Sequence, residues 1–127
     1  MFNFDTDRYL RIQKGAVSQK ESINKAVDQI ASKGYKNLFL IGSGGAAILM
    51  MPIEYMLKTH STLPAYREIA AEFLVMDHKH FSADSLVVLA SLSGTTAETV
   101  EAAKYAKSKG ATTISFVGHQ DTPLAQQ

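Results

Sequence analysis

The sequence predicts an α/β fold, a three-layer αβα sandwich around a doubly wound, flavodoxin-like parallel sheet. Two observations support this prediction. Residues 38–41 and 86–89 are short apolar runs without polar alternation, as in strands that are buried on both faces of a sheet. Each run passes through a glycine-containing loop into a helix-like segment, and repeated strand–loop–helix units build parallel sheets that are covered by helices.

Length and composition favour one globular domain. The chain has 127 residues, of which 46% are apolar and 20% charged, and its net charge is +1. A charge so close to zero disfavours a nucleic-acid surface, and no run reaches the ~18 apolar residues of a membrane span. The N-terminal residues do not resemble a signal peptide, and a chain without cysteine has no thiolate metal site. We therefore expect a cytoplasmic protein with no membrane, nucleic-acid, metal or cofactor partner.

Residues 1–33 predict a helical N-terminal arm. We expect a short helix over 6–14 and a second helix that opens with a capping box at Ser18 and ends before Gly34. The second helix carries one apolar stripe at helical spacing, formed by Ile23, Val27 and Ile30.

Residues 34–127 predict a domain in which strands alternate with helices. The expected strands are Asn37 to Ile41, Pro64 to Glu68, Ser85 to Ala90, and Thr112 to Val117. The expected helices are 45–58, 70–77 and 96–109. Pro52 lies inside the first helix and should kink it or shift its hydrogen bonding, because proline removes a backbone donor. The last helix has a small-residue face that lets it approach the sheet closely, formed by Ala97, Val100, Ala103 and Ala106.

The final residues predict the start of another helix at Pro123, where the chain stops within an α/β unit. Because such units normally return to the sheet, we expect a domain that is truncated at its C-terminus. A missing return strand would leave apolar surface uncovered, and the Met-rich segment 48–56 adds to that surface. On this basis we expect a homo-oligomer.

The segment 91–99 has the sequence Ser-Leu-Ser-Gly-Thr-Thr-Ala-Glu-Thr at a strand-to-helix turn. A helix start offers unsatisfied backbone N–H groups and the positive end of the helix dipole, and hydroxyls add donors without adding charge. The loop contains no lysine and lacks the spacing of a nucleoside-triphosphate loop. It therefore favours a phosphomonoester on a small molecule. A capping box from Thr95 to Glu98 would explain only those two residues.

A second glycine loop, 42–47, follows the first expected strand. The two loops would meet at the carboxyl edge of a parallel sheet, where open α/β sheets bind their ligands. The spacing of Gly42, Gly44 and Ala47 also fits the dinucleotide fingerprint, which requires an acidic residue after the next strand, and Glu68 is a poor match. We rank this Rossmann interpretation lower, because the hydroxyl-rich loop is not part of that fingerprint.

These two loops resemble those of the sugar isomerase (SIS) phosphosugar-binding domain family. The specific part of the resemblance is Ser91-x-Ser93-Gly94-x-Thr96-x-Glu98-Thr99, and the generic part is Gly42-Ser43-Gly44-Gly45. Within the family, the chain is most similar to the N-terminal half of fructosamine-6-phosphate deglycases and related phosphosugar isomerases. Three further features carry this narrower resemblance: Pro52, the segment 71–73 and the segment 122–125. Many members of the family have a serine where this chain has Ala46, which leaves Ser43 as the one hydroxyl of the first loop.

The resemblance implies that the chain binds a sugar phosphate or a fructosamine phosphate. We expect the phosphate to be held by the side chains and backbone N–H groups of Ser91, Ser93, Gly94, Thr95 and Thr96, with Ser43 and Gly44 closing the other side. The implied reaction is an aldose–ketose isomerisation or the cleavage of a fructosamine 6-phosphate. Because the resemblance assigns the acid and base of deglycases to a second SIS half, we expect this chain alone to be inactive.

Two titratable residues are candidates for catalysis. Glu72 and His119 each follow an expected strand, at the carboxyl edge of the sheet, where a side chain could carry a proton. His78 and His80 lack a third ligand nearby, which disfavours a metal site. An alternative function is the sugar-phosphate sensing domain of a transcription regulator, although residues 1–33 are too short and not basic enough for a DNA-binding domain.

Overall fold

The computed structural model describes residues 4–127 and divides into two compact units, Met1–Gly34 and Tyr35–Gln127. The first unit consists of helices α1 (Thr6–Ser18) and α2 (Lys20–Lys33). Asp5 caps α1 by accepting a hydrogen bond from the backbone N–H of Arg8.

Two details of this unit differ from the prediction. The first helix continues past Lys14 to Ser18, whose hydroxyl donates to the carbonyl oxygen of Gly15. The expected capping box at Ser18 does not form, because Ser18 is itself helical and α2 starts after Gln19, which makes no side-chain cap. A capping serine requires an extended backbone, and the chain between the two helices stays close to helical.

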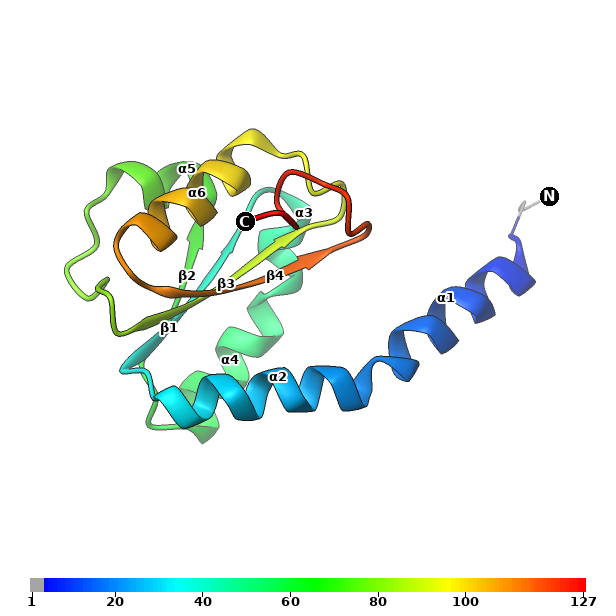
Figure 1. Cartoon of the computed structure of the whole chain (residues 1–127), viewed down its shortest axis with the longest axis horizontal. Coiled ribbons are helices and arrows are strands. Elements are labelled where there is room, and N and C mark those ends of the chain that lie inside the picture. Colours follow the sequence, from blue (N-terminus) through cyan, green and yellow to red (C-terminus); the bar gives the residue numbers. More distant parts are fainter. Residues whose placement is uncertain (1–3) are drawn as a thin grey trace. The chain divides into compact units, whose positions relative to one another are not determined.

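The second unit is a parallel sheet with the strand order β2-β1-β3-β4 (Figure 1). Its strands are β1 (Asn37–Gly42), β2 (Ala65–Ile69), β3 (Ser85–Ser91) and β4 (Thr112–Val117). One face is covered by α5 (Ala70–Val75) and α6 (Ala97–Ser108), and the other carries α3 (Gly45–Leu49) and α4 (Met51–His60). This arrangement confirms the predicted three-layer α/β fold.

The main core lies between the sheet and helices α5 and α6. Phe39 of β1 and Val87 of β3 are paired neighbours, so they point to the same face, where both are fully buried with Phe73 of α5. Burying a side chain of this size contributes about 1.5–3 kcal/mol. The close approach of α6 depends on its small residues, as predicted, but the buried set is Thr99, Val100, Ala102, Ala103 and Ala106. Ala97 is exposed, because it begins the helix at the loop.

The helix expected over 45–58 is two helices. The chain leaves α3 at Met50, which also precedes the first residue of α4. Pro52 lies in the first turn of α4, where its missing N–H would have no partner in any case. The proline therefore starts a new helix instead of kinking a continuous one.

The helix expected from Pro123 does not form, and residues 120–126 make turns and a bend. The backbone N–H of Leu124 donates to the carbonyl oxygen of Gly94, and the Leu124 side chain is fully buried. The C-terminal residues thus pack onto the loop that follows β3.

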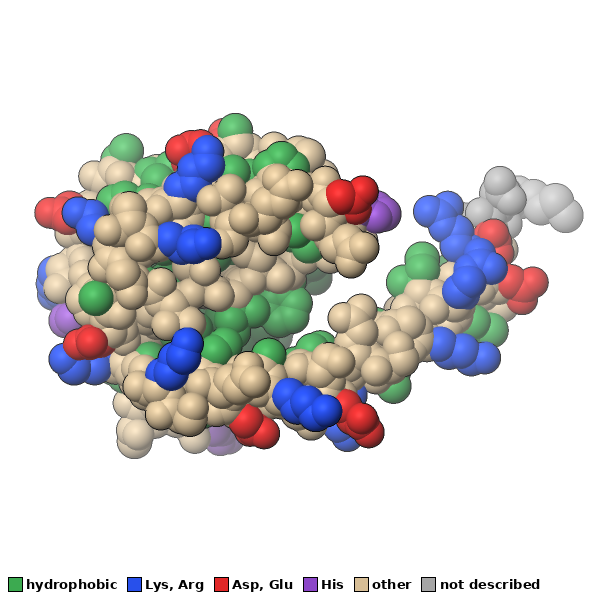
Figure 2. Space-filling model, viewed as in Figure 1, with side chains coloured by type: hydrophobic (Ala, Val, Ile, Leu, Met, Phe, Trp, Pro, Cys, Tyr) green, Lys and Arg blue, Asp and Glu red, His purple; other side chains and the backbone are tan. Residues whose placement is uncertain are grey.

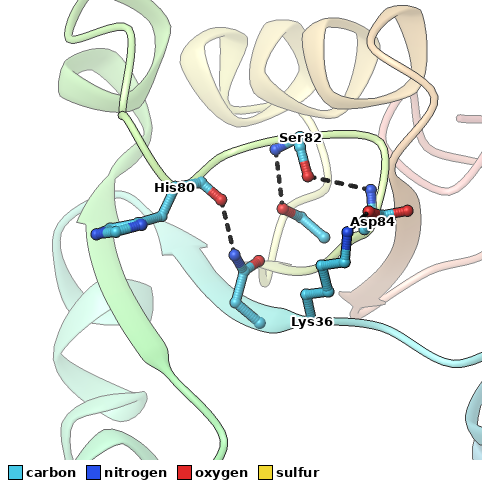
Figure 3. A network of polar contacts seen from close by, with 6 residues as sticks. Lys36, His80, Ser82 and Asp84 are labelled. Atoms are coloured by element: carbon cyan, nitrogen blue, oxygen red, sulfur yellow. Dashed lines mark hydrogen bonds and ion pairs between the residues drawn. The ribbon is translucent and has the colours of Figure 1, made fainter.

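At the amino edge of the sheet, a polar network ties the start of β1 to the loop before β3 (Figure 3). Lys36 pairs with Asp84, and the Asn37 amide donates to the carbonyl oxygen of His80 at 2.7 Å. Within the same loop, the Asp84 N–H donates to the Ser82 hydroxyl. These contacts fix the edge of the sheet opposite the two glycine-containing loops.

Candidate functional site

The strand register brings the two glycine-containing loops to one edge of the sheet. Gly42, the last residue of β1, pairs with Ala90 in the parallel ladder between β1 and β3. The loop after Gly42 and the loop after Ser91 therefore leave the two central strands side by side, at their carboxyl ends. This edge is where open α/β sheets bind ligands.

The second loop gathers its hydroxyl groups around Ser91, which is buried. The Ser91 hydroxyl oxygen lies 3.0 Å from Thr96 Oγ1 and 3.5 Å from Ser93 Oγ. Ser93 Oγ in turn accepts hydrogen bonds from the backbone N–H and the hydroxyl of Thr95, at 3.3 and 3.0 Å. The fold thus joins four hydroxyls in one hydrogen-bonded network that carries no formal charge.

Backbone N–H groups of the same loop complete this arrangement. Gly94 has φ +64° and donates to the Ser91 hydroxyl at 3.1 Å. Helix α6 begins after Thr96, which makes no side-chain capping bond, so the alternative interpretation of this segment, a capping box from Thr95 to Glu98, is wrong. The first N–H groups of α6 consequently lack a cap, and they present donors and a positive dipole end.

The first loop approaches α6 through one hydroxyl contact. Ser43 is half-buried, and its Oγ lies 3.4 Å from Oγ1 of Thr99, which is fully buried on α6. Gly44 has φ +53°, a conformation that favours glycine. A Cβ on Gly42 would lie 2.9 Å from the backbone nitrogen of Ala47, so the turn from β1 into α3 also requires glycine.

Thr99 is missing from the predicted set of site residues, although it belongs to the motif that carries the family resemblance. A clue exists in the sequence, because Thr99 follows Thr96 by three residues and so lies on the same side of a helix. The contact with Ser43 spans 56 positions of the chain, and only the packing of α6 on the sheet brings it about.

The segment after β4, residues 118–127, anchors the second loop through backbone hydrogen bonds. The backbone N–H groups of Gly118 and Leu124 donate to the carbonyl oxygens of Leu92 and Gly94, each at 3.0 Å. Because these bonds use carbonyl oxygens, they anchor the loop without occupying its N–H donors.

The two catalytic candidates flank the loops and do not join them. Glu72 lies in the first turn of α5, directly after β2, and His119 follows β4. Both side chains are exposed, and within residues 4–127 neither has a hydrogen-bond partner in the protein. Their catalytic role stays a prediction.

The charges near the two loops are sparse. Residues 42–47 and 91–99 contain one charged residue, Glu98, and no lysine or arginine. On the face that Figure 2 shows, the Lys and Arg side chains of the second unit are interspersed with Asp and Glu. Within residues 4–127, no cluster of three or more His, Asp or Glu is placed to hold a metal ion. The helices of that part of the chain are too short or too polar to cross a membrane.

Comparisons with known proteins identify the family and the fold of the chain. Residues 32–127 match the SIS domain family. Fructosamine deglycase FrlB of Bacillus subtilis (strain 168) is 33% identical over 102 residues, which make up 80% of this chain and 31% of FrlB.

Two solved structures combine similar sequence with similar fold. A proposed phosphosugar isomerase from Salmonella typhimurium LT2 is 36% identical with a TM-score of 0.76, over 80% of this chain and 31% of that chain. A proposed phosphosugar isomerase from Bacillus subtilis is 35% identical with a TM-score of 0.72, over 73% of this chain and 29% of that chain. This chain therefore spans about a third of the length of these relatives.

Proposed function

The chain belongs to the SIS domain family, and we propose that it binds the phosphate group of a sugar phosphate or a fructosamine phosphate at the carboxyl edge of its sheet. The observation that carries this proposal is the network of four hydroxyls at the start of α6, in a loop without lysine. Such a network suits a phosphomonoester, whose oxygens accept several hydrogen bonds at once.

Each predicted residue has a defined part in this proposal. When the ligand binds, the donors of this loop exchange their internal hydrogen bonds for bonds to the phosphate oxygens. These donors are the hydroxyls of Ser91, Ser93 and Thr96 and the N–H groups of Gly94 and Thr95. Ser43 and Gly44 close the opposite side. A hydrogen bond to a charged group contributes about 1.5–3 kcal/mol, which favours the phosphate over the internal contacts between neutral groups.

The relatives support a proposal for the activity of the longer enzyme to which this chain would correspond in part. FrlB is named a fructosamine deglycase, and two structural relatives are proposed phosphosugar isomerases. We propose that this chain corresponds to the N-terminal SIS half of such an enzyme, with residues 1–33 as an arm and 34–127 as the binding domain. The uncharged loop leaves the sugar end of the ligand free for proton transfer between adjacent carbons. The family match favours this function over dinucleotide binding.

We further propose that the domain works in the cytoplasm as a homo-oligomer. Helices α3 and α4 expose a run of large apolar side chains, each between 48% and 77% exposed: Ile48, Leu49, Met51, Ile53, Tyr55 and Met56. Light scattering at high protein concentration tests the oligomer, and a clean monomer would contradict it.

The binding function is tested by titration calorimetry of the 127-residue chain with glucose 6-phosphate, fructose 6-phosphate and glucose. We expect both phosphorylated sugars to bind and free glucose not to bind. Equal affinity for glucose and glucose 6-phosphate would overturn the proposal. A parallel titration with NADH, followed by its fluorescence, checks the dinucleotide alternative.

A further inference from the structure

Thr99 places a hydroxyl in an otherwise apolar helix face. It is fully buried, and the other buried residues of α6 are Val100, Ala102, Ala103 and Ala106. A buried hydroxyl is costly unless it forms a hydrogen bond, and valine has nearly the same shape without that cost. Packing alone therefore does not explain a threonine at this position.

The hydroxyl has one partner among the described residues, and that partner lies in the first loop. Thr99 Oγ1 is 3.4 Å from Ser43 Oγ. The distance is long for a bond between two hydroxyls, which are usually about 2.7–2.8 Å apart. Hydrogen bonds in ligand-free sites are often long and tighten when the ligand binds, and a small inward movement of the first loop would shorten this one.

The same helix also holds the second loop. Thr96, the residue directly before α6, lies 3.0 Å from Ser91 through the two hydroxyl oxygens. Thr99 follows one turn later and contacts Ser43 of the first loop. The start of one helix thus contacts both loops. It sets the distance between the two groups of residues that are proposed to bind the phosphate.

We propose that Thr99 is a positioning residue, which fixes the first loop against the second through Ser43 and thereby tunes the affinity for the sugar phosphate. The proposal rests on the proposed binding function. Thr99 does not contact the ligand, so its effect depends entirely on the Ser43 hydroxyl.

A set of matched variants tests this proposal by calorimetry with glucose 6-phosphate. Thr99→Val keeps the shape and removes the hydroxyl, and it should weaken binding about three- to tenfold, the size of one hydrogen bond. Thr99→Ser keeps the hydroxyl and should bind within about twofold of the wild type. In the Ser43→Ala background, Thr99→Val should have no further effect.

The outcomes separate the two proposals. If the wild type binds no sugar phosphate, the proposed function fails, and the role of Thr99 in binding falls with it. If the wild type binds and Thr99→Val binds equally well, only the Thr99 proposal fails. An equal loss from Thr99→Val with and without the Ser43 hydroxyl would also overturn it, because the effect would then be structural.

A second measurement does not depend on binding. In the ligand-free protein, amide hydrogen exchange at 43–45 should be faster in Thr99→Val than in the wild type or Thr99→Ser, while exchange in the β3 core stays unchanged. Faster exchange throughout the domain would contradict a specific link to Ser43. An unchanged exchange rate in the first loop would contradict it as well.

Discussion

A Cβ atom on Gly94 would lie 2.2 Å from the hydroxyl oxygen of Thr122, so the hydroxyl-rich loop and the C-terminal segment touch at this glycine. The same glycine has φ +64° and offers its carbonyl oxygen to the N–H of Leu124. The shape of the loop therefore depends on a residue that has no side chain.

We predict that Gly94→Ala displaces this loop. The added methyl group clashes with Thr122, and alanine at a positive φ costs about 1–2 kcal/mol more than glycine. The affinity for glucose 6-phosphate should fall at least about tenfold, with a lower melting temperature. Gly15→Ala is the matched control, because a Cβ on Gly15 meets nothing within 4 Å and alanine favours the helix α1. Binding by Gly94→Ala at wild-type affinity would contradict the dependence of the loop on this glycine.

The hydroxyl network leads to a second prediction. The double substitution Ser93→Ala and Thr96→Ala removes two of the four hydroxyls, each worth about 1.5–3 kcal/mol against a charged ligand. Calorimetry should show at least about a tenfold loss of affinity for glucose 6-phosphate. Ser108→Ala serves as the control, since this exposed hydroxyl lies at the other end of α6 and donates to the carbonyl oxygen of Tyr105. A double variant that binds like the control would show that the phosphate is held elsewhere.

Glu54 gives a prediction about the dependence of stability on pH. Its carboxylate accepts hydrogen bonds from Lys58 Nζ at 2.7 Å and from Arg67 Nε at 2.8 Å. The second of these ion pairs links α4 to β2. Burial alone would raise the pKa of Glu54, but the hydrogen bonds and charges of Lys58 and Arg67 together outweigh it and lower the pKa below 4.5. A lowered folded-state pKa stabilises the fold above the unfolded-state pKa, and this stabilisation is lost as the pH falls through the folded-state pKa.

Chemical denaturation of the wild type and Glu54→Gln at several pH values from 7 to 3 checks this prediction. The wild type should be more stable at neutral pH, and its advantage should be constant down to about 4.5 and then shrink. Glu101→Gln is the control, because the exposed pair of Glu101 and Lys104 should contribute no more than about 1 kcal/mol. An advantage for wild type that grows toward low pH would contradict the sign of the shift.

The last prediction concerns turnover. Glu72 and His119 lie on opposite sides of the two loops, and neither has a partner that would orient it within the described residues. General acid–base catalysis requires a positioned group close to the proton that it moves. A coupled assay for glucose 6-phosphate release from fructosamine 6-phosphates should therefore read background with this chain. Turnover that Glu72→Gln or His119→Asn abolishes would mean that the catalytic centre is complete here.

The strands and loops of the site could be predicted from local sequence. Apolar runs such as 38–41 have no polar alternation, and only a strand covered on both faces buries them completely. The hydroxyl cluster of 91–99 is likewise local, so its place at a strand-to-helix turn followed from the pattern of the segment itself.

Some helix ends could not be predicted, because competing local signals were nearly equal. Ser18 looked like a cap, but the helical backbone continued through it. Pro52 was expected inside one continuous helix, but the chain breaks at Met50 and the proline lies in the first turn of α4.

The sequence by itself determined the parallel α/β fold and the two loops that meet at its carboxyl edge. Only the tertiary structure decided how these loops are held. The contact between Ser43 and Thr99, and the packing of Thr122 and Leu124 against Gly94, join positions far apart in the chain. Local propensity does not encode such contacts, since they form only when the sheet and α6 bring the segments together.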